Sequence, residues 1–500
     1  MLTETAPSTA AAPLTAARAP ETEPDAQAPM PHDEKAIEQF AHRAVQITLD
    51  HLARRETLPA VARPSWAELA AHLMVGSIPR QPTDLAVLLD HLESTYFTAN
   101  ALTSAPSYHA FVPSPSNPLA PWLALLANVF NAWPAAWVAA PGATTIECEL
   151  IDWLRELIGM PEGAGGLLTS GGSEANLTAL RVARHATLDD RPDPASVAYC
   201  SDQAHSSIAR AQQILGFADH QLRTVACDDR QRMDPDALRA MVEEDLAAGR
   251  RPYLVVATAG TTSTGAVDPL PQIAATCREF ELWFHVDAAF GAGARIGNDP
   301  LEKARVEGIQ QADSLIVDPH KALLQPFGVG AVLVREGERL PAAFSMAPAY
   351  LQDAAGEINL YDYGIHLARP DRALGVWASM RALGFDAVAD AIDHGYLLAR
   401  VVEQHLRSSG CWSVISPAQL GIVCFQYDAG AGLDMDAIQR RIVQLMLDDG
   451  SAMVLSTVVG DRTCLRMMTN HPQATPDGVR ATIDLLAHFG AQAAREAGQP

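Results

Sequence analysis

Short apolar segments alternate with longer segments of helical periodicity between residues 143 and 334. The apolar segments predict strands at residues 166–168, 197–200, 223–227, 253–258, 283–286, 315–317 and 331–334. Helices are predicted between them at residues 174–186, 207–215, 234–248 and 270–279. Strands separated by helices form βαβ units with a mainly parallel sheet, which binds ligands at the carboxyl ends of its strands. This alternation predicts an α/β fold with its functional site at that edge of the sheet.

The remainder of the chain predicts three further parts. Residues 1–30 are rich in Ala, Pro and Thr and lack an apolar core, so we expect a disordered tail and no secretory signal. Residues 31–120 predict an N-terminal helical segment, because apolar residues recur there at helical spacing. We expect a large domain at residues 121–384 and a smaller C-terminal α/β domain at residues 385–500.

Composition narrows the partners and the compartment. The formal net charge is -23, and neither nucleic acid nor an anionic membrane attracts so acidic a chain, so we expect neither as a partner. The seven cysteines have no C-x-x-C spacing, which favours reduced thiols in a cytoplasmic protein and predicts no metal site. Residues 118–146 carry no charge, but three prolines interrupt them, so we expect a buried helix and loop at a subunit interface, with no membrane span.

One lysine lies between two predicted strands. Residues 312–334 read ADSLIVDPHKALLQPFGVGAVLV, with the strands on either side of Asp318, His320 and Lys321. Burial disfavours the ammonium form of a lysine, and the neutral amine can then attack a carbonyl group. An exposed turn lysine is equally compatible with this stretch, so the other motifs have to decide.

A glycine-rich turn follows the first predicted strand. Residues 169–176 read TSGGSEAN, and Gly171, Gly172 and Ser173 precede a predicted helix. Glycines allow a close approach of the backbone, and the helix N-terminus favours an anion, so the turn predicts a phosphate site. It matches neither a Walker A loop nor a dinucleotide-binding turn. An ordinary helix start with Ser173 as N-cap remains the alternative.

Three more motifs follow predicted strands. HVDAAF places Asp287 at the end of a strand, where it can keep a pyridinium nitrogen protonated, with the small Ala289 beside a flat ring; a structural N-cap or metal carboxylate is the alternative. In SDQAHSSIAR, His205 is suited to stacking on a ring or to acid–base chemistry, although a lone histidine is more often structural. TAGTTSTG, residues 258–265, is a hydroxyl-rich loop. An amine, a carboxylate, a ring-stacking group and an anion site are what a pyridoxal phosphate enzyme needs.

These motifs resemble those of the group II pyridoxal-phosphate-dependent amino-acid decarboxylases, the aromatic-amino-acid/glutamate decarboxylase-like family of fold type I. The resemblance extends from about Tyr108 to Gly384, and its most specific stretches are TSGGSEANLTALRVAR, SDQAHSSIARA, TAGTTSTGAVDP, HVDAAFGA and ADSLIVDPHKALL. It implies the aspartate-aminotransferase-like fold, with a seven-stranded large domain and an active site at the interface of a homodimer.

The resemblance also implies roles for individual residues. Lys321 would form the aldimine with pyridoxal 5′-phosphate, Asp287 would pair with the pyridine nitrogen, and His205 would stack on the ring. The other residues implied to surround the cofactor are Gly171, Gly172, Ser173, Thr262, Ala289 and His320.

The substrate side is implied by two further segments. FSMAPAYL, residues 344–351, is similar to the mobile catalytic loop of the family, in which Tyr350 would protonate Cα from the neighbouring subunit. YHAFVPS, residues 108–114, is similar to a stretch that lines the substrate across the dimer. The residues expected to contact substrate are Phe111, Ser114, Trp137 and Arg369.

Two positions depart from the aromatic decarboxylases. Asp318 stands where those enzymes carry an asparagine near the phosphate, and a carboxylate repels a phosphate dianion. Ala135 stands where they tend to have a phenylalanine, which weakens the case for an aromatic substrate. The role of Asp318 and the identity of the amino acid are left open by the sequence.

The expected reaction is decarboxylation of an L-amino acid to its amine, through an external aldimine and a quinonoid, with Tyr350 as the Cα proton donor. Aminotransferases, lyases and aldehyde-forming oxidative deaminases use the same fold and are the alternatives. A binding or scaffold protein that has lost its cofactor is the non-enzymatic alternative, and the joint presence of Lys321, Asp287 and His205 argues against it.

Overall fold

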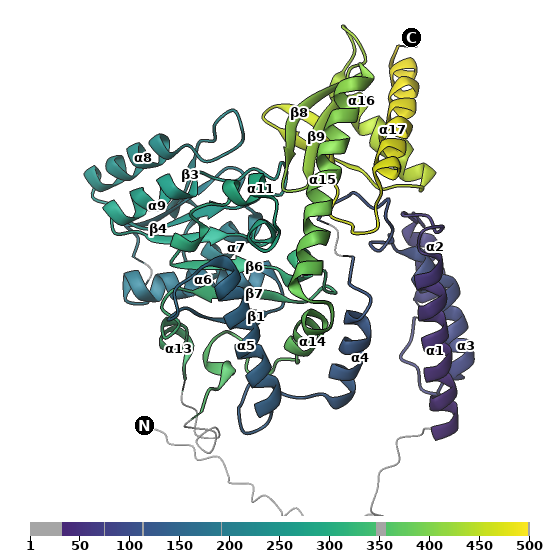
Figure 1. The fold of residues 1–500 in the computed structure, drawn as a ribbon, viewed down its shortest axis with the longest axis horizontal. Helices are drawn as coiled ribbons and strands as arrows, with labels where there is room; N and C mark the ends of the chain where they lie inside the picture. Colours follow the sequence, from purple (N-terminus) through teal and green to yellow (C-terminus); the bar gives the residue numbers. More distant parts are fainter. Residues whose placement is uncertain (1–32, 75, 113–114, 192, 347–356, 499–500) are drawn as a thin grey trace, which may run out of the picture.

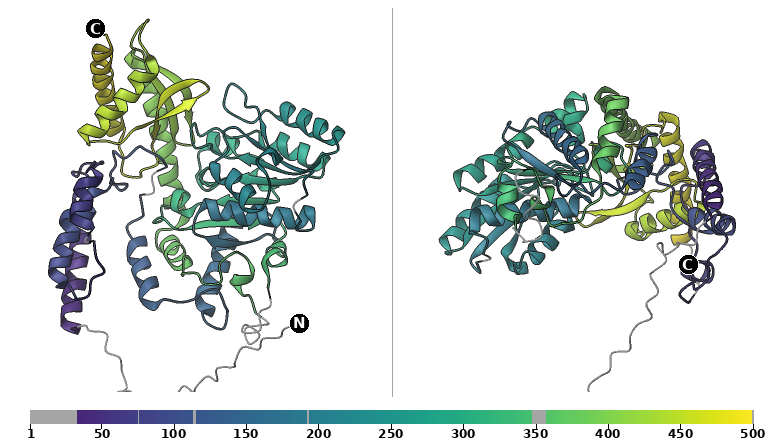
Figure 2. Two further views of the ribbon diagram at one scale, coloured as in Figure 1. Left: turned by 180° about the vertical axis from the view of Figure 1, so that it is seen from behind. Right: turned by 90° about the horizontal axis from the view of Figure 1, so that it is seen from below.

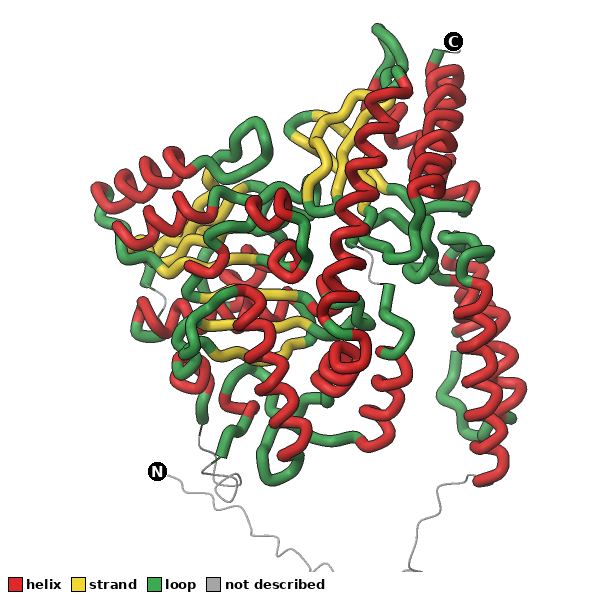
Figure 3. The backbone as a smooth tube through the Cα atoms, in the orientation of Figure 1, coloured by secondary structure: helices red, strands yellow, loops and turns green. Residues whose placement is uncertain are grey.

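The structure is a computed structural model, and it describes residues 33–74, 76–112, 115–191, 193–346 and 357–498. The predicted tail, together with Ser114 and Tyr350, lies outside these residues. The described chain forms a large domain around one sheet, a smaller domain around a second sheet, and N-terminal helices beside them (Figures 1 and 3).

The large domain is built on a seven-stranded sheet with the order β1-β7-β6-β5-β4-β2-β3. The strands are β1 (Gly165–Thr169), β2 (Ser196–Ser201), β3 (Leu222–Val225), β4 (Arg251–Thr258), β5 (Trp283–Asp287), β6 (Ser314–Val317) and β7 (Gly330–Val334). Strand β7 pairs antiparallel with β1 and with β6, and the other pairs of this sheet are parallel. Each strand coincides with an apolar segment of the sequence, so the predicted mainly parallel sheet is confirmed.

Helices cover both faces of this sheet. They are α5 (Pro141–Ile158), α6 (Gly172–Leu188), α7 (Ser206–Ile214), α8 (Pro235–Ala247), α9 (Leu270–Glu279), α10 (Gly293–Ile296), α11 (Pro300–Arg305), α12 (Pro319–Ala322), α13 (Arg339–Phe344) and α14 (Ala373–Leu383). Along β4, Leu254 and Val256 pack in the core with α6 and α7, whereas Val255 and Ala257 pack in the core with α5, α8 and α9. Burial on both faces explains why these strands are uninterrupted apolar runs.

The smaller domain packs three helices on an antiparallel sheet. Its strands β8 (Trp412–Gln419), β9 (Ile422–Tyr427), β10 (Leu455–Val459) and β11 (Arg462–Met468) have the order β10-β11-β9-β8. Its helices are α15 (Phe385–Ser409), α16 (Met435–Asp449) and α17 (Pro476–Ala497). Helix α15 extends from the large domain into the smaller one in Figure 1.

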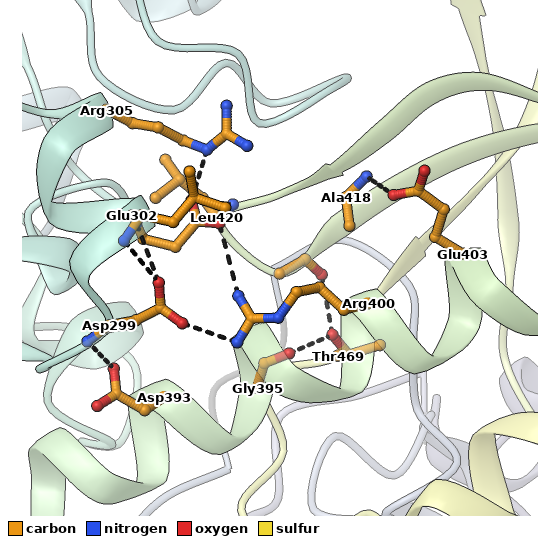
Figure 4. Close-up of polar contacts among 12 residues, drawn as sticks. Asp299, Glu302, Arg305, Asp393, Gly395, Arg400, Glu403, Ala418, Leu420 and Thr469 are labelled. Atoms are coloured by element: carbon orange, nitrogen blue, oxygen red, sulfur yellow. Dashed lines mark hydrogen bonds and ion pairs between the residues drawn. The ribbon is translucent and has the colours of Figure 1, made fainter.

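A polar cluster joins α15 to the large domain (Figure 4). Arg400 on α15 forms an ion pair with Asp299, with Nη2 and Oδ2 2.7 Å apart. Glu302 on α11 accepts hydrogen bonds from the Leu420 amide, at 3.1 Å, and pairs with Arg305, at 3.0 Å. Burial raises the pKa of Glu302, although the neighbouring Arg305 opposes this. Several partners therefore hold one buried carboxylate and fix the angle between the domains.

Helices α1 (Glu34–Arg54), α2 (Trp66–Leu73) and α3 (Leu85–His91) stand beside the smaller domain and apart from the large one (Figure 2). Helix α1 buries no residue, and its apolar residues Ile37, Val45 and Leu49 are exposed. A connector at residues 100–112 leads from them to the two domains, and Tyr108, in the connector, forms a β-bridge with Met453.

The uncharged stretch at residues 118–146 is helical but less buried than expected. It forms helix α4 (Ala120–Phe130), a loop and the start of α5. In the single chain α4 buries only Ala120, and it exposes Leu125, Leu126, Val129 and Phe130, the last at 79%. The expected burial is therefore wrong for α4 within one subunit. None of the described helices is long and apolar enough to cross a membrane.

Candidate active site

A cavity of about 280 Å³ opens at the carboxyl ends of β1, β4, β5 and β6. Parallel strands present the turns that follow them at one edge of the sheet, so motifs distant in sequence meet there. The predicted cofactor and catalytic residues that line the cavity together are Gly171, Gly172, Ser173, His205, Thr262, Asp287, Ala289, His320 and Lys321.

The glycine-rich turn forms a cradle between β1 and α6. Gly171 has φ +148°, a conformation that favours glycine, and α6 begins at Gly172 with its N-terminus toward the cavity. A Cβ atom on Gly172 would lie 2.9 Å from Asp318 Oδ2, and one on Gly330 would lie 2.7 Å from the Gly171 backbone. Positions 172 and 330 therefore accept only glycine. The turn leaves helix N–H groups and Ser173 available for an anion.

Asp287 is held at the end of β5 by a buried amide. Asn176 Nδ2 donates to Asp287 Oδ2 at 3.0 Å and to Ser207 Oγ at 2.9 Å. The Ala289 amide donates to the other carboxylate oxygen at 3.2 Å. Asp287 is 5% exposed and lines the cavity, so its carboxylate is oriented before any ring arrives.

Behind Asn176 a directed chain of hydrogen bonds leads to Trp283. Since Asn176 donates to Asp287, its oxygen must accept from His285 Nε2, 3.0 Å away. Burial lowers the pKa of His285 to about 4, so the ring is neutral and its Nδ1 accepts from Ser314 Oγ at 2.9 Å. Ser314 in turn accepts from Trp283 Nε1 at 2.8 Å. Each donor has an acceptor, which fixes the tautomer of His285.

The same amide orients His205 through Ser207. His205 is the N-cap of α7, and its Nδ1 accepts from the Ser207 amide at 3.2 Å and lies 2.8 Å from Ser207 Oγ. With Nδ1 as acceptor, the neutral ring carries its hydrogen on Nε2. Asn176, Ser207, His285 and Ser314 are site residues that the motifs alone did not reveal, although each stands within one of the quoted stretches.

Lys321 pairs with the residue that departs from the aromatic decarboxylases. Its Nζ lies 2.9 Å from Asp318 Oδ2. Asp318 is 1% exposed, and among the described residues its Oδ1 has no hydrogen-bond partner. His320 Nδ1 donates to the Val329 carbonyl at 2.6 Å, and His320 Nε2 lies 3.6 Å from Asp318 Oδ2.

The smaller domain holds the hydroxyl-rich loop that carries Thr262. Arg466 Nε on β11 donates to the Thr262 carbonyl at 2.7 Å, and its guanidinium also bonds the Phe111 carbonyl. Gln419 Nε2 donates to the Thr264 carbonyl at 3.1 Å. Burial lowers the pKa of Arg466. These contacts join residues 155 to 355 positions apart, and no short motif could reveal them.

Of the predicted substrate residues, the three that the structure describes are not gathered at the cavity. Phe111 is 59% exposed, although its neighbour Val112 lines the cavity. Trp137 donates its backbone N–H to Asn359 and is not among the lining residues. Arg369 is 5% exposed and lies 2.7 Å from Glu147 Oε1, also outside the cavity. Its contacts with Glu147 and the Leu168 carbonyl therefore place Arg369 in the core.

The residues present fit pyridoxal phosphate. The cradle that a Cβ atom would fill suits a phosphate, the Lys321 amine suits an aldehyde, and the oriented Asp287 carboxylate suits a protonated ring nitrogen. His205 and Ala289, the residues predicted to lie against the ring, both line the cavity. Together these groups form a site for a cofactor whose aldehyde binds a lysine amine.

Comparisons with known proteins agree with this chemistry. The family model described as the pyridoxal-dependent decarboxylase conserved domain matches residues 70–428. An aromatic-L-amino-acid decarboxylase from Bacillus atrophaeus is 38% identical over 448 residues, which cover 88% of this chain and 92% of that protein. An L-2,4-diaminobutyrate decarboxylase from Rhizobium meliloti (strain 1021) is 33% identical over 358 residues, 70% of this chain and 71% of that protein.

A solved structure shows the same fold. The crystal structure of Oryza sativa TDC with PLP and tryptamine matches with a TM-score of 0.87 and 27% identity, and the match covers 92% of this chain and 99% of that one. The large domain therefore has the pyridoxal phosphate fold type I predicted from the motifs. The chain belongs to the pyridoxal-dependent decarboxylase family, and it is an enzyme that uses pyridoxal phosphate to decarboxylate an amino acid.

Proposed function

We propose that this decarboxylase converts an aromatic L-amino acid to its amine. The observation that carries the proposal is the 38% identity, over 92% of its length, to a protein named aromatic-L-amino-acid decarboxylase. The identity to the diaminobutyrate decarboxylase is lower and covers less of both chains. Phe290, Val112 and Ile316 add apolar surface to the cavity, which favours an aromatic side chain. Ala135, the departure that weakens the case for an aromatic substrate, is fully buried and is not among the residues that line the cavity.

An amine-product screen tests this substrate class. The purified enzyme is given phenylalanine, tyrosine, tryptophan, 2,4-diaminobutyrate and glutamate, and the products are identified by mass spectrometry. We expect kcat/KM for the best aromatic substrate to exceed kcat/KM for 2,4-diaminobutyrate and for glutamate by roughly 100-fold or more. A preference for diaminobutyrate or glutamate contradicts the aromatic assignment.

The proposed chemistry assigns one task to each side chain. Lys321 supplies the amine that binds the cofactor aldehyde, and Asp287 holds a proton on the pyridine nitrogen. When bound, pyridoxal phosphate withdraws the electrons left at Cα after CO₂ departs. His205 packs against the ring and directs its Nε2 hydrogen into the cavity, and Tyr350 donates a proton to Cα.

Lys321→Ala tests the first of these tasks. We expect loss of decarboxylation and of the visible absorbance of the lysine-bound cofactor, because no other amine is proposed to reach the aldehyde. Lys321→Arg is the matched control: it keeps the charge beside Asp318 but cannot react, so it should behave as the alanine variant does. A chromophore that borohydride still traps in either variant contradicts the lysine assignment.

The proposed assembly is a homodimer in which a second copy covers α4 and the helices α1–α3. Support comes from the apolar residues that α4 exposes in one chain, since contiguous exposed apolar surface marks interfaces. Helix α1 presents a second apolar row without burying any residue. Helices α1 and α4 lie on the same side of the molecule in Figures 1 and 2.

Charge insertion on α4 tests the dimer. Phe130→Glu should give a monomer by sedimentation velocity, because a buried unpaired carboxylate is costly at an interface. Leu246→Glu, at an apolar residue 48% exposed on α8, is the matched control and should stay dimeric. A Phe130→Glu protein that sediments as the wild type excludes α4 from the interface.

The domain limits and the compartment complete the proposal. The large domain is assigned to residues 121–384 and the smaller one to residues 385–500, which is supported by the end of α14 at Leu383 and the start of α15 at Phe385. The helical segment at residues 31–120 precedes them. All seven cysteines are free thiols, which supports a reducing, cytoplasmic location.

A further inference from the structure

Asp318 has a buried carboxylate oxygen for which the protein offers no donor. The residue follows β6 and precedes the short helix α12, and it is 1% exposed. Its Oδ2 lies 2.9 Å from Lys321 Nζ, so this ion pair orients the carboxylate. Its Oδ1 has no hydrogen-bond partner within the described ranges. An unsatisfied buried acceptor is costly, which makes a donor on the bound ligand the natural partner.

The carboxylate lies against the cradle proposed for the phosphate. A Cβ atom on Gly172, the first residue of α6, would lie 2.9 Å from Oδ2 and 3.4 Å from Oδ1. A Cβ atom on Gly330 would lie 2.8 Å from Oδ1. The N–H groups at the start of α6 attract an anion, whereas the Asp318 carboxylate repels one. Both therefore lie at the same small space.

A proton on the phosphate resolves this conflict. A carboxylate and a phosphate dianion repel each other, whereas a P–OH group donates to a carboxylate oxygen in a short, charge-assisted hydrogen bond. We infer that Asp318 accepts a hydrogen bond from a protonated phosphate oxygen, so that the site takes the cofactor phosphate as its monoanion. This inference rests on the proposed position of the phosphate at residues 171–173.

The inference fixes the sign of a pH dependence. A phosphate ester has its second pKa near 6, so the monoanion fraction falls roughly 70-fold between pH 5.5 and pH 8. Wild-type affinity for the phosphate should fall by up to that factor as the pH rises. Asn in place of Asp318 presents an N–H donor to the dianion, so Asp318→Asn should lose this fall or reverse it. The other charged or titratable groups at the cavity are Glu174 on α6, His205 on α7, Asp287 on β5, and His320 and Lys321 on α12.

Pyridoxine 5′-phosphate is the probe, because it carries the ring and the phosphate but has no aldehyde to react with Lys321. Its affinity for the full-length apoenzyme is measured by calorimetry from pH 5.5 to pH 8, for the wild type and for Asp318→Asn. The ratio of the two affinities cancels the titration of the ring and of the groups that both proteins share. We expect this ratio to change by about 70-fold or more across the range; a ratio that is constant with pH overturns the inference.

Sulfate provides a second test, because it has no proton to donate over this range. Inorganic phosphate should displace the probe from the wild-type apoenzyme while sulfate does not, and both should displace it from Asp318→Asn. Asp287→Asn removes an equal charge at the ring-nitrogen end of the cavity, so it should keep the wild-type discrimination. Equal displacement by sulfate and phosphate in the wild type overturns the inference.

Ser173→Ala separates this inference from the proposed phosphate position. We expect weaker probe binding with an unchanged pH dependence, because the variant removes a donor and leaves Asp318 in place. Affinity that is unaffected by Ser173→Ala removes the cradle assignment and the Asp318 inference with it, whereas decarboxylation by the wild-type holoenzyme is untouched by either result.

Discussion

At the scale of single residues, Asn176 carries more contacts than its place in the sequence suggests. One amide holds Asp287, Ser207 and His285 in fixed orientations, and it is 1% exposed. Buried polar networks are rigid when every member has a partner, and they become costly when one is missing. The orientation of the carboxylate and of the His205 ring thus depends on a side chain that has no chemistry of its own.

Asn176→Leu should weaken both the fold and the cofactor site. Leucine has a similar volume but leaves Asp287 Oδ2 and His285 Nε2 without partners, at about 1–3 kcal/mol for each group. We expect a lower thermal midpoint of the apoenzyme and faster loss of cofactor from the holoenzyme on dialysis. A variant with wild-type stability and cofactor retention would show that the network does not orient Asp287.

Arg369 offers a contrast between a structural and a substrate-binding role. Its guanidinium pairs with Glu147, which is 1% exposed and also accepts from the Leu168 amide at 2.9 Å. Burial raises the pKa of Glu147, and Arg369 opposes this rise. Removing one partner of such a pair leaves a buried charge uncompensated.

Arg369→Met should therefore destabilise the protein by about 3–5 kcal/mol. The double variant Glu147→Gln/Arg369→Met should recover most of this loss, because glutamine is neutral and still accepts from Leu168. Chemical denaturation measures the free energy of unfolding of the single and the double variant. If Arg369→Met instead raises KM at unchanged stability, the arginine acts on substrate as the sequence led us to expect.

At the scale of elements, the connector at residues 100–112 is attached to the smaller domain by two buried histidines. His109 Nδ1 donates to the Met468 carbonyl at 3.1 Å, and His471 Nε2 donates to the Ser104 carbonyl at 3.0 Å. Burial lowers the pKa of each ring to about 4. The neutral rings therefore stabilise the fold above about pH 6.5, and this stabilisation is lost as the pH falls through about 4.

Acid should weaken this attachment, and it should also weaken the large domain, where burial lowers the pKa of His285 to about 4. Each histidine should lose about 2 kcal/mol of its contribution between pH 7 and pH 5. We expect amide exchange of the connector to accelerate accordingly, and His109→Asn, which keeps a donor but does not titrate, to be less sensitive to pH. Asp268 acts in the opposite direction, because burial raises its pKa to about 6, so the difference between variant and wild type is the quantity to compare. Equal pH sensitivity of the two proteins contradicts this account.

At the scale of the whole molecule, the apolar surface of α4 and the proposed role of Tyr350 as proton donor raise one question, namely whether each site draws on two subunits. Lys321→Ala and Tyr350→Phe should each abolish amine formation. If Tyr350 reaches the site of the neighbouring subunit, a mixed dimer of the two variants contains one complete site. Random exchange makes half the dimers mixed, so about 25% of wild-type activity should return on mixing.

Activity assays after co-refolding or subunit exchange measure this recovery. The two variants assayed separately are the control, and mass spectrometry of intact dimers reports the fraction that is mixed. Mixed dimers without activity would place Tyr350 in the site of its own subunit.

The sheet, and the meeting of the motifs at one cavity, were predictable from the sequence for a physical reason. Strands buried on both faces must be continuous apolar runs, and a phosphate cradle at a helix start needs glycines. Strands β1 to β7 and the turn at residues 171–173 can therefore be recognised from short stretches of sequence. The meeting of the motifs at one edge of the sheet then followed from the carboxyl-end rule for parallel sheets. The membership of the decarboxylase family followed from those motifs.

Tertiary structure alone decided the remainder. Asn176 bonds to Asp287, 111 positions away, and Arg466 bonds to Thr262, 204 positions away, and neither pairing leaves a periodic signal in the sequence. The same holds for Arg369, whose burial beside Glu147 depends on how α5 packs against the chain that precedes α14. Sequence by itself determined the elements and the chemistry they carry, because both depend on neighbours along the chain. The pairing of Asp318 with Lys321 is local, three positions along the chain, but the missing donor for the second Asp318 oxygen was decided only when distant segments packed around one cavity.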